Sequence, residues 1–496
     1  MSEVGLGVWD LAGLLGRIAR LEDENAALGG ERERLEAEAQ RLEHERERLR
    51  ADNERLRETN ERLRGEIEAL RRAAKRQAAP FSKGDPTPNP KRAGRRPGAA
   101  YGARAHRRPP ERVDRVDRVV TVGLPARCPG CGGELVTERV AVQHVEELPE
   151  PVPLITRFEV PIGRCVSCGR RVQPRHPEQT SDALGAAGAQ LGPRAVATAS
   201  WLNKSLGLSA GKIAGLLGQL GLQVTAGGVV QAVARAGRRG QPTYQALIAG
   251  VRASPVVAPD ETGWRVGGRR AWLWAFVGDQ LTVYHVANGR GFADAVQVLG
   301  EDFAGVLERD GWAPYRRFVL ARHQSCLAHP LRRCRELIAD ADRGQARTPH
   351  AVRRILQRAL ELRDAHADGL VDQAVLAAEA DRLDAQVEAL IAGATRYPPN
   401  RRLLAHLDRE REHLFTFLRI PGVQATNWRA EQAIRPAVVT RKNWGGNRTR
   451  AGADTWQILT SVLRTAAQQA RDPVTLLAEL LRAPAPVVAD LAIPGR

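Results

Sequence analysis

Three acidic residues lie in surroundings that suit metal-dependent chemistry on phosphodiesters. Asp260 follows the apolar run SPVVAP and Asp310 follows AGVLER, whereas Glu431 lies in a helical stretch whose flanks are rich in Arg, Lys and Asn. Two magnesium ions roughly 4 Å apart need carboxylates at strand ends, one of them bridging, to hold a phosphate between them. Asp260, Asp310 and Glu431 are therefore the candidate catalytic residues and magnesium ligands. The alternative for Glu431 is a surface glutamate in a salt-bridged helix.

Basic and polar residues downstream of Glu431 are candidates for contacts with DNA. A carboxylate that holds a metal ion against DNA needs cations nearby that bind the phosphates. We predict such contacts for Arg435, Arg441, Lys442, Asn443 and Arg448.

Other polar and aromatic residues of these segments have simpler interpretations. Glu261 is a candidate hydrogen-bond acceptor that supports the acids, and Asp279 belongs to a turn. Three tryptophans could stack on an unpaired base, with core packing as the alternative for each; they are Trp264, Trp428 and Trp444.

The stretch from residue 254 to 320 is predicted to form strands and one helix that position the acids. The runs AWLWAFV and LTVYHVA are separated by a short turn at Gly278, which predicts a hairpin, and a helix is expected from Phe292. This order is the ribonuclease H-like layout. Because proline cannot donate to a sheet ladder, Pro259 predicts that the first strand ends, or lies at a sheet edge, beside Asp260.

Four cysteines form two CxxC pairs, which indicate a zinc site. Two such pairs present four thiolates at the corners of a tetrahedron, the geometry of a structural zinc ribbon. The ligands of this one zinc ion are predicted to be Cys128, Cys131, Cys165 and Cys168, and the residues between the pairs are rich enough in Val, Ile and Phe for a small β-sheet. Free cysteines are the alternative.

A further group of Cys and His residues follows Asp310. Cys326 and His329 form a CxxH motif, with His323 and Cys334 close by. Helical spacing does not point all four at one ion, so we favour a structural or phosphate-facing role in support of the active site over a second zinc.

The N-terminal region has the pattern of a coiled coil. Leucine recurs every seventh residue from Leu14 to Leu70 within highly charged sequence. With these leucines at heptad position d, several residues at position a are polar, which favours a parallel dimer in fixed register. The residues at position a are Ile18, Asn25, Arg32, Ala39, Arg46, Asn53, Asn60 and Ile67. A single charged helix on a globular core is the alternative.

Two segments between these regions could bind DNA without decisive sequence signals. The Pro, Gly and Arg-rich residues 78–112 form a basic linker that either lies along phosphates or is a solvated spacer. Residues 190–250 are helical, with Ser209 and Thr225 as N-caps and breaks at Gly207 and Gly221. They resemble a helix-turn-helix, but simple packing helices are equally compatible.

The composition favours a nucleic-acid partner and an intracellular location. At 496 residues the chain is too long to fold around a single hydrophobic core. Its 75 Lys and Arg residues against 57 Asp and Glu residues leave a formal charge of +18. No signal peptide or membrane-spanning run is evident, and six cysteines suit a reducing compartment. We therefore expect a cytoplasmic, nucleoid-associated protein with no membrane partner.

Several long motifs, in order, carry a family resemblance. DETGW, DGWAPY, CLAH, and NWRAEQAIRP followed by RKNWGG resemble the transposase of the insertion sequence 66 family. The resemblance implies that Asp260, Asp310 and Glu431 are the catalytic triad, and that an α-helical insertion precedes the helix of Glu431. It also implies small accessory proteins of the same element as partners. The C-terminus lacks the Leu-Pro-Trp ending of many relatives, which leaves a C-terminal partner contact without support.

The sequence thus predicts a multidomain α+β protein with a ribonuclease H-like α/β catalytic domain. The expected parts are a leucine-zipper coiled coil (10–77), a basic linker (78–112), a CxxC zinc-binding domain (113–180), a helical, helix-turn-helix-like DNA-binding region (185–250), the catalytic domain (251–330 and 426–472), a helical insertion (331–425) and a C-terminal tail (473–496).

The predicted function is that of a DDE transposase that binds terminal inverted repeats and target DNA, and catalyses strand cleavage and strand transfer with two Mg²⁺ ions. A homodimer or higher oligomer is expected through the coiled coil. The alternative is a zinc-containing dimeric DNA-binding regulator without catalysis, and a nuclease without strand transfer would share the acids.

Overall fold

A computed structural model describes residues 11–75, 116–148, 150–179, 190–341, 344–393 and 395–495. Contacts within the chain divide it into two units, Met1–Val145 and Glu146–Arg496, which we describe separately. The basic linker 78–112 lies outside the described residues. No helix in the described ranges is long and apolar enough to cross a membrane.

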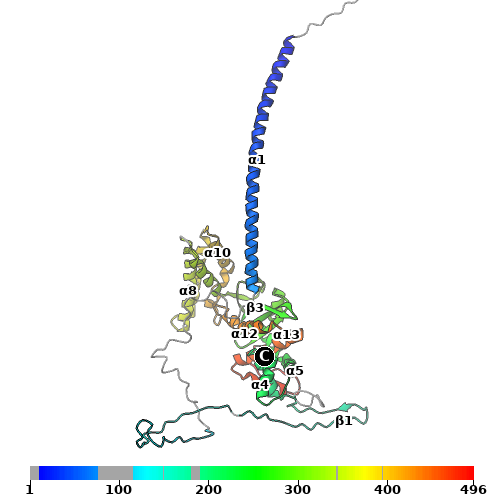
Figure 1. Ribbon diagram of the computed structural model, residues 1–496, viewed down its shortest axis with the longest axis vertical. Coiled ribbons are helices and arrows are strands. Elements are labelled where there is room, and N and C mark those ends of the chain that lie inside the picture. Colours follow the sequence, from blue (N-terminus) through cyan, green and yellow to red (C-terminus); the bar gives the residue numbers. More distant parts are fainter. Residues whose placement is uncertain are drawn as a thin grey trace, which may run out of the picture. The chain divides into compact units, whose positions relative to one another are not determined.

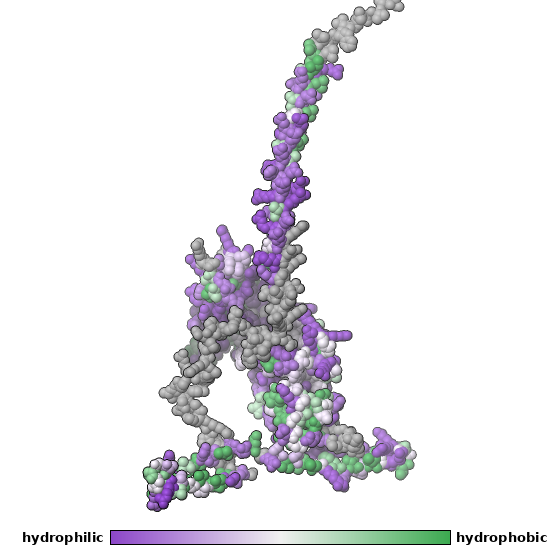
Figure 2. Space-filling view, in the orientation of Figure 1, coloured by the Kyte–Doolittle hydropathy of each residue, from purple (hydrophilic) through white to green (hydrophobic). Residues whose placement is uncertain are grey.

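The heptad region forms one continuous helix, α1 (Leu11–Lys75). Charged side chains pair along it at helical spacing, as in Arg32 with Glu36 and Arg62 with Glu66. The heptad leucines from Leu21 to Leu56 are more than half exposed, and Figure 2 shows hydrophobic residues recurring along the otherwise hydrophilic surface of α1. The helix is confirmed, and its pairing with a second copy stays a prediction.

Each CxxC pair closes a tight turn of similar geometry. The backbone N–H of Gly132 donates to the carbonyl of Cys128 (2.8 Å), and the N–H of Gly169 donates to that of Cys165 (2.9 Å). Both glycines have positive φ, which L side chains rarely adopt. The chain reversal brings the two thiols of each pair to one side, as a metal knuckle requires.

The small sheet expected between the two pairs does not form in the described residues of that segment. Those residues are irregular, and side chains such as Val140 and Ile155 are more than four-fifths exposed. The strands of this region, β1 (Gly163–Arg164) and β2 (Arg171–Val172), instead pair antiparallel around the second knuckle. The segment buries too little apolar surface to stabilise a larger sheet.

A five-stranded mixed sheet forms the centre of the second unit. Its strand order is β5-β4-β3-β6-β7. Strand β4 is antiparallel to both of its neighbours, β3 and β5, whereas β6 and β7 run parallel to β3. The predicted hairpin and the helix from Phe292, α6 (Phe292–Leu299), are confirmed. The strands are β3 (Val256–Val266), β4 (Arg269–Val277), β5 (Thr282–Ala287), β6 (Val306–Arg309) and β7 (Arg322–Ser325).

The expectation that β3 ends or lies at an edge at Pro259 is wrong. Pro259 lies inside the central strand, opposite Phe276 of β4. The nitrogen and carbonyl of a strand residue point to the same side, and the Pro259 carbonyl accepts a hydrogen bond from Asn427 rather than from β4. The proline nitrogen therefore faces the side where the pairing with β6 has already ended, at Val257, and no ladder bond is lost.

Helices pack against both faces of the sheet in two separate cores, and Figure 1 shows helices beside strand β3. On one face, Ala258 and Trp264 of β3 pack with Ala430 and Ala433 of α12 (Trp428–Trp444). Trp456 of the next helix, α13 (Arg450–Gln468), belongs to the same core. Successive strand side chains alternate between faces. The even-numbered residues of β3, Asp260 among them, therefore face α12.

The side chains of α13 also satisfy the outer edge of β5. The backbone N–H groups of Thr282, Tyr284 and Val286 donate to side-chain oxygens of α13 at 2.8 to 3.1 Å. The acceptors are four residues apart along one helix face: Gln457, Ser461 and Thr465. The last strand on this side of the sheet is thus covered by a helix that bonds to its main chain.

The other face of the sheet is covered by helices that precede its strands in the chain and by one that follows them. Ser209 and Thr225 accept N-cap hydrogen bonds as predicted, and the chain breaks between helices at Gly207 and Gly221. These helices share one hydrophobic core with the sheet, α13 and the C-terminal residues. This favours a packing role over a separate DNA-binding domain. The helices are α3 (Pro193–Lys204), α4 (Ala210–Gln219), α5 (Ala226–Arg252) and α14 (Pro473–Arg482).

The residues expected as a C-terminal tail are a packed part of the fold. Leu477 and Leu481 of α14, together with Ala489 and Ile493, are buried in the core that α3 and α5 line. Ile493 lies against Gly250 of α5 so closely that a Cβ on that glycine would meet it at 2.6 Å.

The segment between β7 and α12 is helical, as predicted for the insertion. Its helices bury a core of their own, rich in leucine. One short 3-10 turn, η2 (Ala313–Arg317), lies between β6 and β7, and another, η3 (Arg411–His413), lies inside this segment, between α10 and α11. The helices are α7 (Ala328–Ala339), α8 (Arg347–Ala367), α9 (Gln373–Ala392), α10 (Pro398–Glu410) and α11 (Thr416–Arg419).

Candidate active site

The three predicted acids come from three different elements around the end of β6. Asp260 lies in β3 on the face that α12 covers, and Asp310 follows the last residue of β6. Glu431 lies in the first turn of α12. Asp260 and Asp310 are half-buried, whereas Glu431 is exposed. Strand β3, the end of β6 and the start of α12 therefore meet at one location, although they are far apart in the sequence.

The acids influence one another electrostatically. Burial raises the pKa of Asp260 to about 7, and the neighbouring charges of Glu261, Asp310 and Glu431 act in the same direction. The backbone N–H of Glu261 donates to Asp260 Oδ1 at 2.9 Å and opposes this increase in pKa. A site with this much unbalanced negative charge favours a bound cation.

The donor set suits magnesium better than a soft metal. Magnesium binds carboxylate oxygens and water, and it is held by one or two carboxylates rather than by a complete protein cage. In the described part of the chain, no three His, Cys, Asp or Glu side chains stand close enough to hold an ion as they are placed. Ligation by all three acids thus requires side-chain rotation, for which the exposed Glu431 is free.

Glu261 anchors the other face of β3 beneath the acids, as an acceptor of two hydrogen bonds. Its carboxylate, 2 % exposed, pairs with Arg290 Nε at 2.6 Å and accepts a hydrogen bond from the Tyr315 hydroxyl. Tyr315 is fully buried against Trp274. This hydrogen bond links the motifs DETGW and DGWAPY, because Glu261 belongs to the first and Tyr315 to the second. The roles of Arg290 and Tyr315 were not predicted.

Arg290 also fixes the residues that follow Asp310. Its guanidinium lies 3.9 Å from the ring centre of Trp312 and 5.0 Å from that of Trp272. Trp312 donates from its indole to the Arg290 carbonyl (3.2 Å) and from its backbone to Asp310 Oδ1 (2.8 Å). One carboxylate oxygen of Asp310 is therefore oriented by its own loop.

Asn427 joins the start of α12 to β3 and β7. Its side-chain amide donates to the Pro259 carbonyl at 2.8 Å, and its backbone N–H donates to Cys326 Sγ at 3.3 Å. Cys326 is buried, and burial raises the pKa of its thiol. Cys326 thus acts as a structural acceptor that positions the helix of Glu431. Asn427 is the first residue of the motif NWRAEQAIRP, but its role was not predicted.

Two members of the predicted Cys and His group, His323 and Cys334, have other surroundings than Cys326. His323 is buried beside Arg309, whose Nε lies 3.1 Å from its Nδ1, and Cys334 is buried in the core of the insertion. The described residues contain no Cys and His cluster placed to hold a second zinc.

The basic residues of the RKNWGG region divide into two groups. Arg441 is half-buried and donates to the Thr262 hydroxyl and the Gly263 carbonyl of β3, so it stabilises the strand. The others remain exposed and available to a ligand: Arg435, Lys442, Asn443 and Arg448.

The three tryptophans also divide. Trp264 is buried against Trp456 and donates to Asn447 at 2.8 Å, which makes it a core residue. Trp428 is 56 % exposed, and Trp444 is half-buried.

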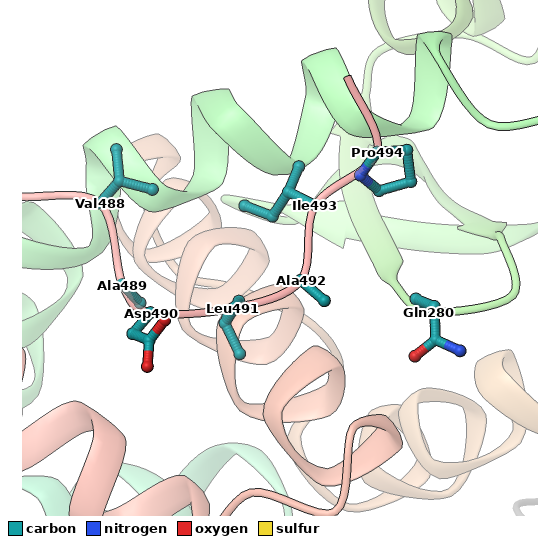
Figure 3. A pocket seen from close by; sticks show the side chains of 8 residues that line it. All are labelled: Gln280, Val488, Ala489, Asp490, Leu491, Ala492, Ile493 and Pro494. Carbon is teal, nitrogen blue, oxygen red and sulfur yellow. The ribbon is translucent and has the colours of Figure 1, made fainter. Parts of the chain in front are cut away.

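A pocket of about 690 Å³ lies away from the acids. Its lining comes from the C-terminal segment Val488–Pro494 and from Gln280 at the β4–β5 turn (Figure 3). Asp490 is its only charged lining residue. It offers neither paired acids nor cations for phosphate, so the acid cluster is the better candidate site.

The comparisons with known proteins agree with the resemblance of the motifs. Residues 188–455, more than half of the chain, match the profile described as Transposase IS66 family. The chain therefore belongs to the IS66 transposase family. It is also 25 % identical over 243 residues to the uncharacterized protein y4qI of Sinorhizobium fredii (strain NBRC 101917 / NGR234). That match covers 43 % of this chain and 43 % of the relative, so it spans less than half of the relative's length.

Proposed function

We propose that this protein is a DDE-type transposase that binds the terminal inverted repeats of an insertion sequence and catalyses DNA strand cleavage and strand transfer. The observation that carries the proposal is the meeting of Asp260 in β3, Asp310 directly after β6 and Glu431 in α12. Burial raises the pKa of Asp260, and the charges of Asp310 and Glu431 add to this increase. Membership of the IS66 transposase family supports the same reaction.

The sheet topology supports a ribonuclease H-like catalytic domain. Three antiparallel strands are followed by two parallel strands beside the first, with a helix between β5 and β6. In this arrangement the acids of the central strand and its parallel neighbour lie side by side at one end of the sheet, and a later helix brings the third.

Asp260, Asp310 and Glu431 are the residues that would hold two Mg²⁺ ions. When bound, the ions supply positive charge that polarises the scissile phosphate. The chain's own residues orient the ligands: the backbone of Trp312 holds Asp310, Asn427 fixes the start of the helix of Glu431, and Arg290 with Tyr315 holds the strand of Asp260 through Glu261.

The exposed basic residues near α12 would bind the DNA backbone. Arg435, one turn after Glu431 in α12, and Lys442 and Arg448 further along the chain are exposed, in a chain with a formal charge of +18. Contacts of this kind are insensitive to base sequence and weaken as salt rises.

Two further parts would serve assembly. The leucine stripe of α1 is proposed to pair in parallel with a second copy of this chain. The two CxxC turns are proposed to hold one structural Zn²⁺ through Cys128, Cys131, Cys165 and Cys168. Small accessory proteins of the same element are further proposed partners.

The proposal is tested by separating catalysis from binding. Asp310→Asn removes negative charge that offsets the metal ions, while most affinity comes from cations elsewhere, so we expect loss of cleavage and joining with nearly unchanged binding. Asp260→Asn and Glu431→Gln should behave alike, and Asp279→Asn, in the exposed turn, is the active control. The assay uses a labelled duplex of the terminal repeat for cleavage, joining and gel shift.

The outcomes distinguish the alternatives. Joining by Asp310→Asn at the wild-type rate would exclude the enzyme and leave a dimeric DNA-binding regulator. Cleavage by the wild-type protein without joining of pre-cut ends would indicate a nuclease that lacks strand transfer.

A further inference from the structure

The helical insertion reaches the residue next to Asp310. Gly311 lies beneath the imidazole of His406 from α10, so closely that a Cβ built on this glycine would stand 3.1 Å from Cε1 of the ring. That distance is shorter than most real Cβ contacts. The glycine of DGW therefore leaves room for a side chain supplied from almost a hundred residues further along the chain.

A buried ion pair holds α10 in this position. Glu410 Oε2 pairs with Arg309 Nη1 at 2.7 Å, and both side chains are almost fully buried. Arg309 Nη1 also donates to the Asp310 carbonyl at 3.0 Å. Because His406 and Glu410 are four residues apart, they lie on one face of α10. This face thus contacts the residues on both sides of Asp310.

The imidazole of His406 keeps its polar atoms available. Within the described ranges, no hydrogen bond involves either of its ring nitrogens, and the residue is half-buried. Burial lowers its pKa, and the nearby charges of Arg409, His329 and Arg316 act in the same direction while Glu410 opposes them. Whether neutral or protonated, the ring carries at least one N–H donor.

A second histidine lies close to the first. His329 at the start of α7 is near enough to influence His406 electrostatically. Its Nδ1 is buried without a hydrogen-bond partner in the described residues, which is uncommon for a buried polar atom and points to a missing ligand. Two imidazoles beside the strand end that bears Asp310 suit a phosphate oxygen, which accepts N–H donors.

We propose that α10 of the insertion contributes His406 to the active site, where its imidazole N–H donates a hydrogen bond to a phosphate oxygen of the DNA strand bound at Asp310. His329 lies near enough to affect the pKa of His406 and adds a second imidazole to this site. The inference rests on the proposed function, because it takes the DNA strand to be bound at the acids.

The test compares substitutions that separate packing from hydrogen bonding. His406→Leu keeps apolar volume but removes the donor, and we expect cleavage of the labelled terminal-repeat duplex to slow about 100-fold in single turnover. His406→Gln restores an amide donor and should recover part of this rate. Gel-shift affinity should change little, since most phosphate contacts remain. His350→Leu, on the exposed surface of α8, is the matched control.

Each result has a defined meaning. Wild-type rates in His406→Leu, with Asp310→Asn inactive in the same assay, would overturn the inference and leave the proposed function standing. Equal slowing in His406→Leu and His406→Gln, with lower unfolding midpoints for both, would assign a packing role and also overturn it. An active Asp310→Asn would instead remove the proposed function.

Discussion

Asp260 carries its carboxyl where a negative charge is unfavourable. Its pKa is raised from 3.8 to about 7, so ionisation costs folding free energy, fully above pH 7 and not at all well below pH 4. We predict that Asp260→Asn stabilises the metal-free protein at pH 8 by on the order of 2 kcal/mol, a value reduced for the partial exposure of the group. The gain should shrink towards pH 4.

Thermal unfolding across this pH range, with Asp279→Asn as the exposed control, measures the effect. A variant that gains as much at pH 4 as at pH 8 would contradict it. Adding Mg²⁺ should stabilise the wild-type protein more than Asp260→Asn, because the variant loses a proposed ligand.

At the same scale, the sequence offered the three acids as candidates but did not indicate the residues that contact them. Asp260 and Asp310 are recognisable because each acid follows an apolar run that ends near it. Arg290, Tyr315 and His406 act through contacts between distant segments, which neither spacing nor residue type reveals. Arg441 shows the reverse error: a basic residue in a basic segment was assigned to DNA, but it bonds the main chain of β3.

At the scale of elements, the buried pair Arg309–Glu410 joins the insertion to β6. Removing one partner leaves a charge buried without compensation, whereas replacing both with apolar residues removes the desolvation cost as well. We predict that Glu410→Gln lowers the free energy of unfolding by about 3 kcal/mol, and that Arg309→Met with Glu410→Leu recovers most of it. Urea unfolding measures both. A double variant less stable than the single one would show that the pair is needed for more than charge balance.

The two CxxC turns give a second prediction at this scale. We expect one zinc ion per chain, lost when Cys128 or Cys165 is replaced by Ser, because each knuckle supplies half of the ligands. Metal analysis of the purified protein decides, with Cys334→Ser in the insertion core as a control that should retain zinc. Purified protein without zinc would contradict the zinc-ribbon prediction, and two zinc ions per chain would support a second site near Cys326.

Elements with strong local signals were predictable, and those set by tertiary context were not. The hairpin of β4 and β5, the helix from Phe292 and the caps at Ser209 and Thr225 follow from turn and capping chemistry. The prediction from Pro259 was wrong because a proline ends strand pairing only where its nitrogen would have to donate a hydrogen bond. The positions of β6 and Asn427 show that the nitrogen faces the side where pairing has already ended.

At the scale of the whole molecule, the exposed leucines of α1 predict self-association. Removing residues 1 to 76 should reduce the oligomeric state measured by sedimentation, because the heptad leucines form the predicted dimer interface. Leu35→Lys with Leu42→Lys should do the same, whereas Ala37→Lys with His44→Lys adds equal charge on the opposite helix face and should not. An oligomer that survives the truncation would locate assembly elsewhere.

The helix that covers β5 has a consequence for synthesis of the chain. Until residues 457–465 have emerged and docked, three main-chain N–H groups of β5 have no acceptor, and the sheet presents an open edge that another strand can join. A product truncated after the acid-bearing α12 would thus hold every proposed metal ligand and still be prone to aggregate by strand pairing. Docking of α13 therefore removes this open edge of the sheet.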